Sequence, residues 1–336
     1  MKNNESVKKS PKRRVKGAYS MPEILYVSPS PHMRKLDTVR SIMLDVIIAL
    51  VPAVFWAVYA FGHRAVNILL VSVITAVACE AVSCLVAKKK IVTITDLSAF
   101  VTGLMFGLML PSGVALWVPA VGSAFAIIVA KQFFGGLGMN IVNPAIAARV
   151  FIMLCWPEQL VKFVSKSGDL MSAATPLVTM KEGATPRISL FHLVLGQGAG
   201  AIGEVSAIAL SAGFIYLLAR KVISWHIPAA FMGTVVLISI VAPQINETTG
   251  VYYQLLSGSL MFAAIFSAND TTTTPVTNTG KLIFGLGCGL ITVFIRYFGA
   301  YPDGTAFAIL LMNLLVPFID ARTRPMAFGG KNEKKQ

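Results

Sequence analysis

Four residues near the middle of the chain have the types and the spacing that a covalent modification requires. They are Asp169, Ser172, Ala174 and Thr175, and they fit the pattern Asp-x-x-Ser-x-Ala-Thr. A flavin transferase recognises this pattern and esterifies the threonine hydroxyl with the phosphate of FMN. Such an ester suits a cofactor outside the cytoplasm, because a flavin held there by weak contacts alone would diffuse away. The sequence therefore predicts that Thr175 carries covalent FMN.

A second Ala-Thr-Pro sequence, at 184–186, serves as an internal comparison. The residue six positions before Thr185 is Thr179 rather than Asp, and the residue three positions before it is Glu182 rather than Ser. Because only the first copy has the complete pattern, Thr175 is the predicted acceptor. The alternative is a chance match in a loop whose threonines are ordinary solvated residues.

The composition determines which kind of fold must position these residues. The chain has 336 residues, of which 55% are hydrophobic and 13% charged, and its mean hydropathy is +0.72. Apolar runs of about 20 residues are long enough to cross the roughly 30 Å hydrocarbon core of a bilayer as helices. The sequence therefore predicts an all-α polytopic membrane protein with about ten transmembrane helices. The predicted spans are 42–61, 66–87, 95–110, 113–133, 141–156, 201–219, 226–243, 253–268, 282–298 and 304–320.

The distribution of basic residues predicts the orientation of the chain in the membrane. The formal net charge is +14, and Lys and Arg gather in the segments that would share one side with the N-terminus. Because cytoplasmic segments carry an excess of Lys and Arg, both termini are predicted to be cytoplasmic and the loop at 157–200 extracytoplasmic. The charge thus indicates anionic membrane lipids as partners rather than nucleic acid.

The loop at 157–200 divides the predicted helices into five and five. An odd number in each half makes the second half run opposite to the first, which is the geometry of an inverted repeat. A short internal similarity between 102–106 and 257–262 favours the same interpretation. The predicted parts are a basic N-terminal segment at 1–40, a first membrane half at 41–156, a flavin-bearing loop with an interfacial helix at 157–200, a second membrane half at 201–320 and a basic tail at 321–336.

Glycines and asparagines interrupt the predicted helices between 133 and 144. Gly135 and Gly136 would let the backbone approach a ligand closely, and Asn140 and Asn143 would share one face if a helix begins there. Their amides could donate to and accept from a planar heterocycle. The alternative is a helix–helix turn in which an asparagine caps the next helix. The residues alone leave both interpretations open.

Several ionisable residues lie in or near predicted spans, where burial of a charge is costly. Asp45 and Glu80 are the carboxylates expected on an ion path, and Arg149 and Glu204 are further functional candidates. The alternative is that such residues form structural pairs between helices. A second break, at 267–280, is rich in threonine. It could line an ion or cofactor cavity, or it could be an ordinary solvated turn.

The cysteines do not have the spacing of a metal site. Cys79, Cys84, Cys155 and Cys288 all fall in apolar spans, and none belongs to a C-x-x-C pair. We therefore expect small core residues rather than ligands. No metal site and no catalytic residue is predicted within the chain itself. The sequence leaves open an iron–sulfur site shared with a partner subunit.

Taken together, these residues show that the sequence resembles the RnfD/NqrB family, the flavin-carrying membrane subunits of the Rnf and Na+-NQR respiratory complexes. The resemblance extends from residue 28 to residue 329, and the short N-terminal extension is closer to RnfD than to NqrB. The segments that carry it include Ser-Pro-Ser-Pro-His at 28–32, Gly-Gly-Leu-Gly-Met-Asn-Ile-Val-Asn-Pro at 135–144, the pattern ending at Thr175, Thr-Asn-Thr-Gly-Lys at 277–281 and Tyr-Pro-Asp-Gly at 301–304.

The resemblance implies an electron-transfer subunit of a ferredoxin:NAD+ oxidoreductase that exports Na+ or H+. FMN on Thr175 would receive electrons from the covalent FMN of the G subunit, and riboflavin or another non-covalent flavin would lie against Asn140 and Asn143. The implied partners are the A, B, C, E and G subunits and, for maturation, a flavin transferase. The chain would lie in the plasma or inner membrane of a bacterium or archaeon, and would not be a complete enzyme alone.

Three other functions fit parts of the same sequence. The homologous NqrB subunit of a Na+-translocating NADH:quinone reductase would share the same flavin pattern. A ten-helix secondary transporter with inverted repeats would share the architecture but would have no use for a flavinylation site. A purely structural assembly subunit would likewise carry no flavin. Covalent flavin on Thr175 therefore separates the first of these from the other two.

Overall fold

The computed structural model describes residues 38–87, 95–164, 176–181, 190–196, 200–204, 206–241 and 251–324. All of these residues belong to one contact unit, Thr38–Gln336. Among them the regular structure is helical, and an isolated antiparallel bridge joins Pro111 to Ala201. The predicted all-α class is confirmed for the part of the chain that is described.

The helices follow one another along the chain with short connections. The first half contains α1 (Val39–Phe61), α2 (His63–Val86), α3 (Ser98–Leu108), α4 (Trp117–Phe125) with the π-helix η2 (Ala126–Gln132), and α5 (Pro144–Cys155). The middle contains the 3-10 helix η3 (Pro157–Gln159), α6 (Pro176–Lys181) and α7 (Leu190–Leu195). The second half contains α8 (Ala207–Ala219), α9 (His226–Val241), α10 (Val251–Leu256), α11 (Leu260–Phe262) with the π-helix η5 (Ala263–Ser267), α12 (Asn278–Phe298) and α13 (Thr305–Thr323).

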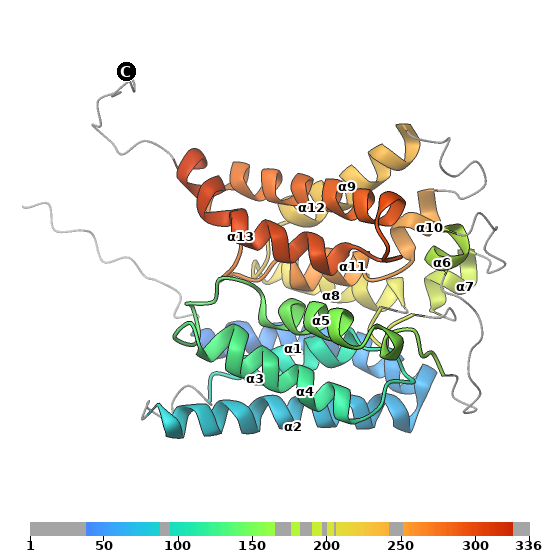
Figure 1. The fold of residues 1–336 in the computed structure, drawn as a ribbon. Coiled ribbons are helices and arrows are strands. Elements are labelled where there is room, and N and C mark those ends of the chain that lie inside the picture. The colour runs from blue at the N-terminus through green and yellow to red at the C-terminus, as the bar shows by residue number, and fades with distance from the viewer. Residues whose placement is uncertain are drawn as a thin grey trace, which may run out of the picture. The chain divides into compact units, whose positions relative to one another are not determined.

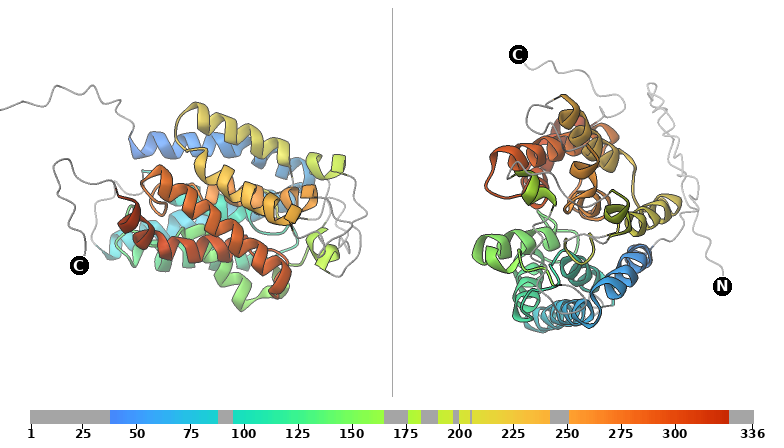
Figure 2. Two further views of the ribbon diagram at one scale, coloured as in Figure 1. Left: turned by 90° about the horizontal axis from the view of Figure 1, so that it is seen from above. Right: turned by 90° about the vertical axis from the view of Figure 1, so that its right-hand side faces the viewer.

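The helices of the two halves form two groups. Figure 1 shows α2–α5 on one side and α9, α12 and α13 on the other, and the end-on view of Figure 2 shows the same division. Within the groups, α2 packs against α3 and α4, and α12 packs against α9 and α13. Two helix pairs connect the first half of the chain to the second: α1 packs against α8, and α5 packs against α13. The short helices α6, α7 and α10 meet at one end.

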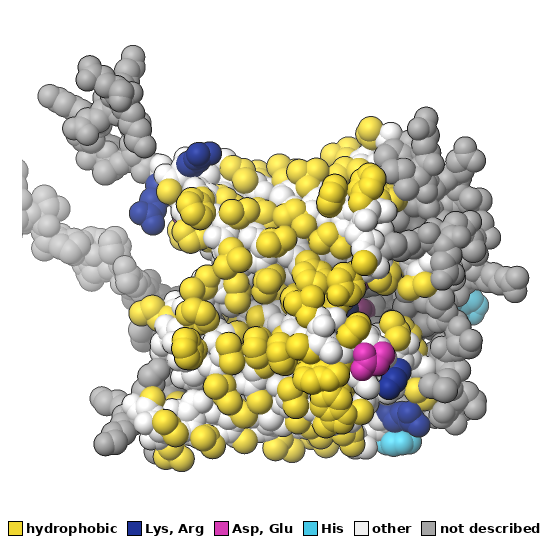
Figure 3. All heavy atoms as spheres, viewed as in Figure 1, with side chains coloured by type: hydrophobic (Ala, Val, Ile, Leu, Met, Phe, Trp, Pro, Cys, Tyr) yellow, Lys and Arg dark blue, Asp and Glu magenta, His cyan; other side chains and the backbone are white. Residues whose placement is uncertain are grey.

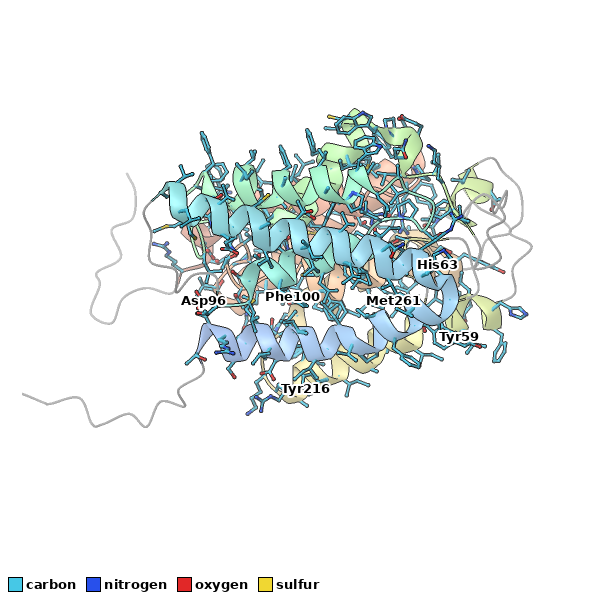
Figure 4. All side chains as sticks on the ribbon, turned by 90° about the horizontal axis from the view of Figure 1, so that it is seen from below. Tyr59, His63, Asp96, Phe100, Tyr216 and Met261 are labelled. Carbon is cyan, nitrogen blue, oxygen red and sulfur yellow. The ribbon has the colours of Figure 1, made fainter. Side chains whose placement is uncertain are left out.

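Polar residues at helix starts explain where several helices begin. Thr38, Ser206 and Thr277 precede α1, α8 and α12, and each side-chain oxygen accepts a hydrogen bond from a backbone N–H of the first turn. Such caps satisfy donors that have no partner inside the helix. Between α1 and α2, Gly62 has a φ of 64°, which a residue without a Cβ adopts readily. Figure 4 labels Tyr59 and His63 near this turn and Asp96 near the opposite end of α2.

The surface and helix lengths support a membrane protein. Figure 3 shows a face that is largely hydrophobic across its middle, with charged side chains toward its ends. The helices α1, α2, α12 and α13 are long and apolar enough to span a membrane, whereas α3, α5, α8 and α9 are shorter apolar helices, as is the stretch Trp117–Gln132. The polytopic class is thus confirmed. Each of the ten predicted spans overlaps a helix, but the count of ten crossings stays a prediction.

The predicted interruptions are confirmed in place, with narrower bounds: residues 133–143 and 268–277 are outside helices, whereas Pro144, Ser267 and residues 278–280 are helical. The first follows η2 and the second follows η5, so a π-helix precedes each break. π-helical turns are rare and often mark functional sites. The predicted span at 253–268 is itself divided, because α10 ends at Leu256 and α11 begins at Leu260.

Candidate functional site

An inner cavity lies where the first break meets the second. Its empty space is about 760 Å³, part of it open to the surroundings, which is within the usual range for small-molecule sites. The walls come from the starts of α1, α3 and α5, the ends of η2 and α8, and the segment after η5. Most lining side chains are apolar. The polar ones are Ser98, Thr102, Lys131, Asn140, Asn143, Asn269, Asp270, Thr271 and Thr272.

Asn143 joins the two halves of the protein at this cavity. Its Oδ1 accepts hydrogen bonds from the backbone N–H groups of Ala145 and Ile146, so it caps α5. Its Nδ2 donates to the carbonyl of Ser267 at 3.0 Å. The side-chain amide of Asn313, oriented to satisfy both of its neighbours, accepts from the Asn143 backbone N–H at 3.1 Å. Asn143 thus takes the capping role that was the alternative for this segment, and its carbonyl oxygen is fully used.

Asn140 differs from Asn143 in the hydrogen bonding of its side-chain oxygen. Its Oδ1 is buried and accepts no hydrogen bond from the described part of the chain, and the residue lines the inner cavity. A buried acceptor without a partner costs free energy unless a ligand or water satisfies it. Gly135 and Gly136, with φ values of 121° and 104°, shape the turn but are not among the lining residues. The fit to a flavin therefore rests on Asn140, whose acceptor suits a ring N–H.

The inner cavity also receives a buried ion pair that the sequence did not predict. Lys131, at the end of η2, is 1% exposed, and its Nζ lies 2.6 Å from Glu80 Oε1 and 2.7 Å from Ser98 Oγ. Leu97, which precedes Ser98, has a φ of 60°. This left-handed conformation is strained for a residue with a bulky side chain. The expected ion-path residue Glu80 is therefore bonded to a cation at the cavity wall.

Asp270 lies across the cavity on the segment that follows η5. Its carboxylate accepts hydrogen bonds from the hydroxyls of Thr272 and Thr273, at 3.1 and 3.4 Å. Burial raises the pKa of Asp270 above its ordinary value, although these hydrogen bonds oppose the shift. Of the residues that line the inner cavity, Lys131 and Asp270 are the ionisable ones.

An outer cavity lies at the other ends of α3 and α5. Its empty space is about 830 Å³, partly open, and its walls include Met109, Met153, Gly258 and the α6 residues Leu177 and Val178. The predicted FMN acceptor Thr175, with Asp169, Ser172 and Ala174, lies outside the described residues. Because α6 begins at Pro176, however, Thr175 is two residues before a side chain that lines this cavity.

A buried network of charges forms one wall of the outer cavity. Arg149 Nη1 donates to Glu204 Oε1 and to the carbonyl of Met109, each at 2.6 Å. Its Nη2 lies 3.8 Å from Asp303 Oδ2, and Arg296 Nη2 lies 3.5 Å from Asp303 Oδ1. Burial would raise the pKa of Asp303, but Arg296 and Arg149 outweigh this and hold it below its ordinary value.

The other expected ion-path residue, Asp45, connects α1 to α8. Its carboxylate accepts from the Arg220 guanidinium at 3.2–3.3 Å and from the Tyr216 hydroxyl at 3.0 Å. Asp45 and Glu80 thus lie in separate ion pairs on different helices. Cys84 and Cys288 are buried in α2 and α12, and the described residues contain no group of three or more His, Cys, Asp or Glu placed to hold a metal.

Comparison with known proteins establishes the relationship of the chain. Residues 26–329 match the family described as NQR2, RnfD, RnfE. The chain belongs to this family. The match covers all the described helices, so the inner and outer cavities both lie within the family region.

Several relatives are similar over nearly the whole chain. The D subunit of the Na(+)-translocating ferredoxin:NAD(+) oxidoreductase complex of Acetobacterium woodii is 41% identical over 317 residues, which cover 93% of this chain and 98% of the relative. Its proton-translocating counterpart from Clostridium ljungdahlii is 39% identical over 91% of this chain and 96% of the relative. The D subunit of the ion-translocating oxidoreductase complex of Stutzerimonas stutzeri is 35% identical over 87% and 93%. These relatives are subunits of ion-translocating oxidoreductase complexes.

The sequence patterns do not reveal the roles of three residues. Lys131 and Arg296 fall in the predicted spans 113–133 and 282–298 without an assigned role, and Asp303 belongs to the family motif at 301–304. The structure brings the first to the inner cavity and the other two to the outer network. One available signal was that Arg296 lies within an apolar span, where a charge needs a partner.

Proposed function

We propose that this family member is the D subunit of an Rnf-type ferredoxin:NAD+ oxidoreductase and relays electrons between two flavins. FMN esterified to Thr175 receives electrons outside the cytoplasm, and a second, non-covalent flavin in the inner cavity receives them next. The observation that carries the proposal is the position of the flavinylation pattern, whose acceptor directly precedes the helix that lines the outer cavity. The electron flow is coupled to translocation of Na+ or H+.

The outer cavity supports a docking place for the covalent flavin. Leu177 follows Thr175 by two residues and is 5% exposed, so the start of α6 is held against the bundle. The cavity combines apolar walls with the side chains of Arg149, Glu204 and Asp303, the mixture of many apolar and few polar groups that binds planar cofactors. When bound, the flavin supplies the electron-carrying chemistry, and these side chains orient its ring and limit access of water.

The inner cavity supports the second flavin. Asn140 supplies an unpartnered acceptor, and the apolar side chains around it supply a surface for a planar ring. The segment after the first break reaches this cavity at Asn143, and α5 leads from there to the outer cavity at Met153. The 12 residues of α5 rise about 18 Å. The inner cavity is lined by Ala145 and the outer cavity by Arg149 and Met153, so the two proposed sites follow one another along this helix.

The proposed arrangement in the membrane follows from the charge distribution. Ten helices cross the membrane as two inverted halves, both termini are cytoplasmic, and the loop at 157–200 faces outward. In this orientation the outer flavin takes electrons from the covalent FMN of the G subunit, while the A, B, C and E subunits complete the path. A flavin transferase esterifies Thr175: the hydroxyl loses its proton, and its oxygen replaces the leaving group of an activated FMN donor.

Asp45 and Glu80 remain the proposed carboxylates of an ion path through this subunit. Each is already paired with a cation, Asp45 with Arg220 and Glu80 with Lys131. A translocated Na+ or H+ would therefore have to compete with a guanidinium or an ammonium. Ion binding at either carboxylate should therefore become easier when its ion pair is weakened.

In-gel flavin fluorescence tests the proposal directly. The full chain is expressed with a flavin transferase, denatured in SDS and compared with Thr175→Ala and Thr185→Ala. We expect fluorescence in the wild type and in Thr185→Ala and none in Thr175→Ala, because only Thr175 has the complete recognition pattern. Absence of fluorescence from the wild type despite an active transferase would overturn the proposal. It would leave the secondary transporter as the better interpretation of the architecture.

A further inference from the structure

Lys131 is the one lysine that the described part of the chain buries almost completely. It is 1% exposed, although lysine side chains are rarely buried without a partner. Its partner is Glu80 on α2, at 2.6 Å, and Ser98 at the start of α3 is the second acceptor, at 2.7 Å. Three separate helical elements therefore fix the position of one ammonium group.

The ion pair is oriented toward the inner cavity. Lys131 and Ser98 are among the residues that line the cavity, whereas Glu80 is not. The positive end of the pair thus faces the cavity, and the negative end lies behind it. An ammonium carries three N–H donors. Glu80 and Ser98 take two of them, and no described residue accepts the third.

The backbone that carries Lys131 and Ser98 departs from regular α-helical geometry. Lys131 lies in the π-helix η2, and Ser98 follows the left-handed residue Leu97. Both features place side chains where a regular helix would not. Replacement of a buried ion pair by apolar residues of similar volume is often neutral or stabilising, so packing alone does not require this pair. A positive charge at a cavity wall suits a ligand whose own charge becomes more negative.

We propose that Lys131 is a fixed positive charge for the electron-accepting ligand of the inner cavity, positioned by Glu80 and Ser98. The inference rests on the proposed function, in which that ligand is a non-covalent flavin. The outer flavin gives up one electron, and the inner ligand gains that electron and becomes one charge more negative. Lys131 stays protonated and Glu80 stays ionised in this step. The ammonium lowers the energy of the reduced ligand because the added charge lies beside it in a medium of low dielectric constant.

The other charges around the cavity agree with this role. Asp270 is the second ionisable residue that lines it, and burial raises the pKa of its carboxyl. Asp96, near the start of α3, is partly exposed to the surroundings and is not among the lining residues. Among the residues that line the cavity, Lys131 is thus the one basic side chain.

A redox titration of the inner flavin tests the inference. The full-length Thr175→Ala chain lacks the covalent flavin, so its visible absorbance reports the non-covalent one. Lys131→Met should lower the midpoint potential, Glu80→Gln should raise it, and Lys131→Arg should leave it near the starting value. The expected change for Lys131→Met is at least tenfold in the equilibrium between oxidised and reduced flavin.

A double variant removes the risk of misfolding. Lys131→Met alone leaves Glu80 buried without a cation, whereas Glu80→Gln with Lys131→Met removes both charges of this pair. Because Lys131 is the nearer charge, the potential of the double variant should still lie below that of the starting chain. An unchanged potential in the double variant, with flavin still bound, would overturn this inference and leave the proposed function intact. Absence of extractable flavin from the starting chain would overturn the second flavin site and this inference together.

Discussion

Among single residues, Glu204 provides the clearest test of the outer charge network. Its carboxylate accepts from Arg149 at 2.6 Å, and both side chains are at most 10% exposed. Breaking a buried ion pair typically costs about 3–5 kcal/mol, and Arg149 would keep only the more distant carboxylate of Asp303, at 3.8 Å. We therefore expect Glu204→Ala to lower the thermal unfolding temperature of the detergent-solubilised protein strongly, measured by intrinsic fluorescence during heating.

Glu158 is the matched control for this prediction. It is an exposed glutamate in the short helix η3, close to the same end of the protein, and no salt bridge is formed by it in the described structure. Glu158→Ala should change stability by no more than about 0.5 kcal/mol, as expected for a surface substitution. Equal unfolding temperatures for the two variants would show that the Arg149–Glu204 pair contributes little.

The sequence identified several buried charges but not their partners. Asp45, Glu80, Arg149 and Glu204 were recognised because each lies in or near an apolar span, where an ionised group is costly. The pairing depends on which helices meet, and the paired residues are 51 positions apart for Glu80, 55 for Arg149 and 175 for Asp45. No local pattern specifies contacts over such separations. The role of Thr175 is different, since a transferase reads a contiguous segment.

At the level of elements, glycines determine how closely α12 and α9 pack. A Cβ added to Gly289 would lie 2.6 Å from Thr234 Cβ, and one added to Gly285 would lie 2.7 Å from Ala230 Cβ. This G-x-x-x-G spacing lets helix backbones approach closely in membranes. Because overpacking of a tight contact costs about 1–3 kcal/mol, Gly289→Ala should lower the unfolding temperature of the solubilised protein.

Gly233 on α9 offers the comparison within the same helix pair. A Cβ added there meets nothing within 4 Å, and alanine favours the helix by about 0.8–1.0 kcal/mol over glycine in model systems. Gly233→Ala should therefore leave the unfolding temperature unchanged or raise it slightly. If Gly289→Ala behaved in the same way, the α9–α12 contact would have to be looser than the structure shows.

The elements were predicted with uneven success for physical reasons. Long apolar runs gave α1, α2, α12 and α13 directly, and Gly-, Asn- and Thr-rich segments gave the two confirmed breaks. The early end of α3 at Leu108 and the π-helices were not predicted. Leu108 and Leu110 offer backbone carbonyls to the N–H groups of Gly203 and Ile202. Such an interaction with a distant segment, which competes with helix continuation, leaves no local trace in the sequence.

For the whole molecule, the contacts between the halves are those that an inverted repeat predicts. The first helices of the two halves, α1 and α8, pack against each other. The last helices, α5 and α13, also pack against each other. An added Cβ on Gly213 of α8 would lie only 2.3 Å from the carbonyl oxygen of Ala49 on α1. At the second contact, Asn143 and Asn313 join α5 to α13. The two cavities then occupy opposite ends of the same interface.

The topology prediction depends on whether the short helices cross the membrane with the long ones. Ten crossings place residue 90 inside, residue 112 outside and residue 134 inside, although α3, between the first two, has only 11 residues. Alkaline phosphatase is active only outside the cytoplasm. Fusions truncated after Ser112 should therefore be active, and fusions after Lys90 and Phe134 inactive.

The same series locates the flavin loop and the C-terminus. A phosphatase fusion after Leu160 should be active and one after Arg324 inactive, because an odd number of crossings separates them in the proposed arrangement. Equal activity after Lys90 and Ser112 would mean that α3 does not complete a crossing. The loop with Thr175 would then lie on the cytoplasmic side, where a flavin would need no covalent tether to be retained by the cell.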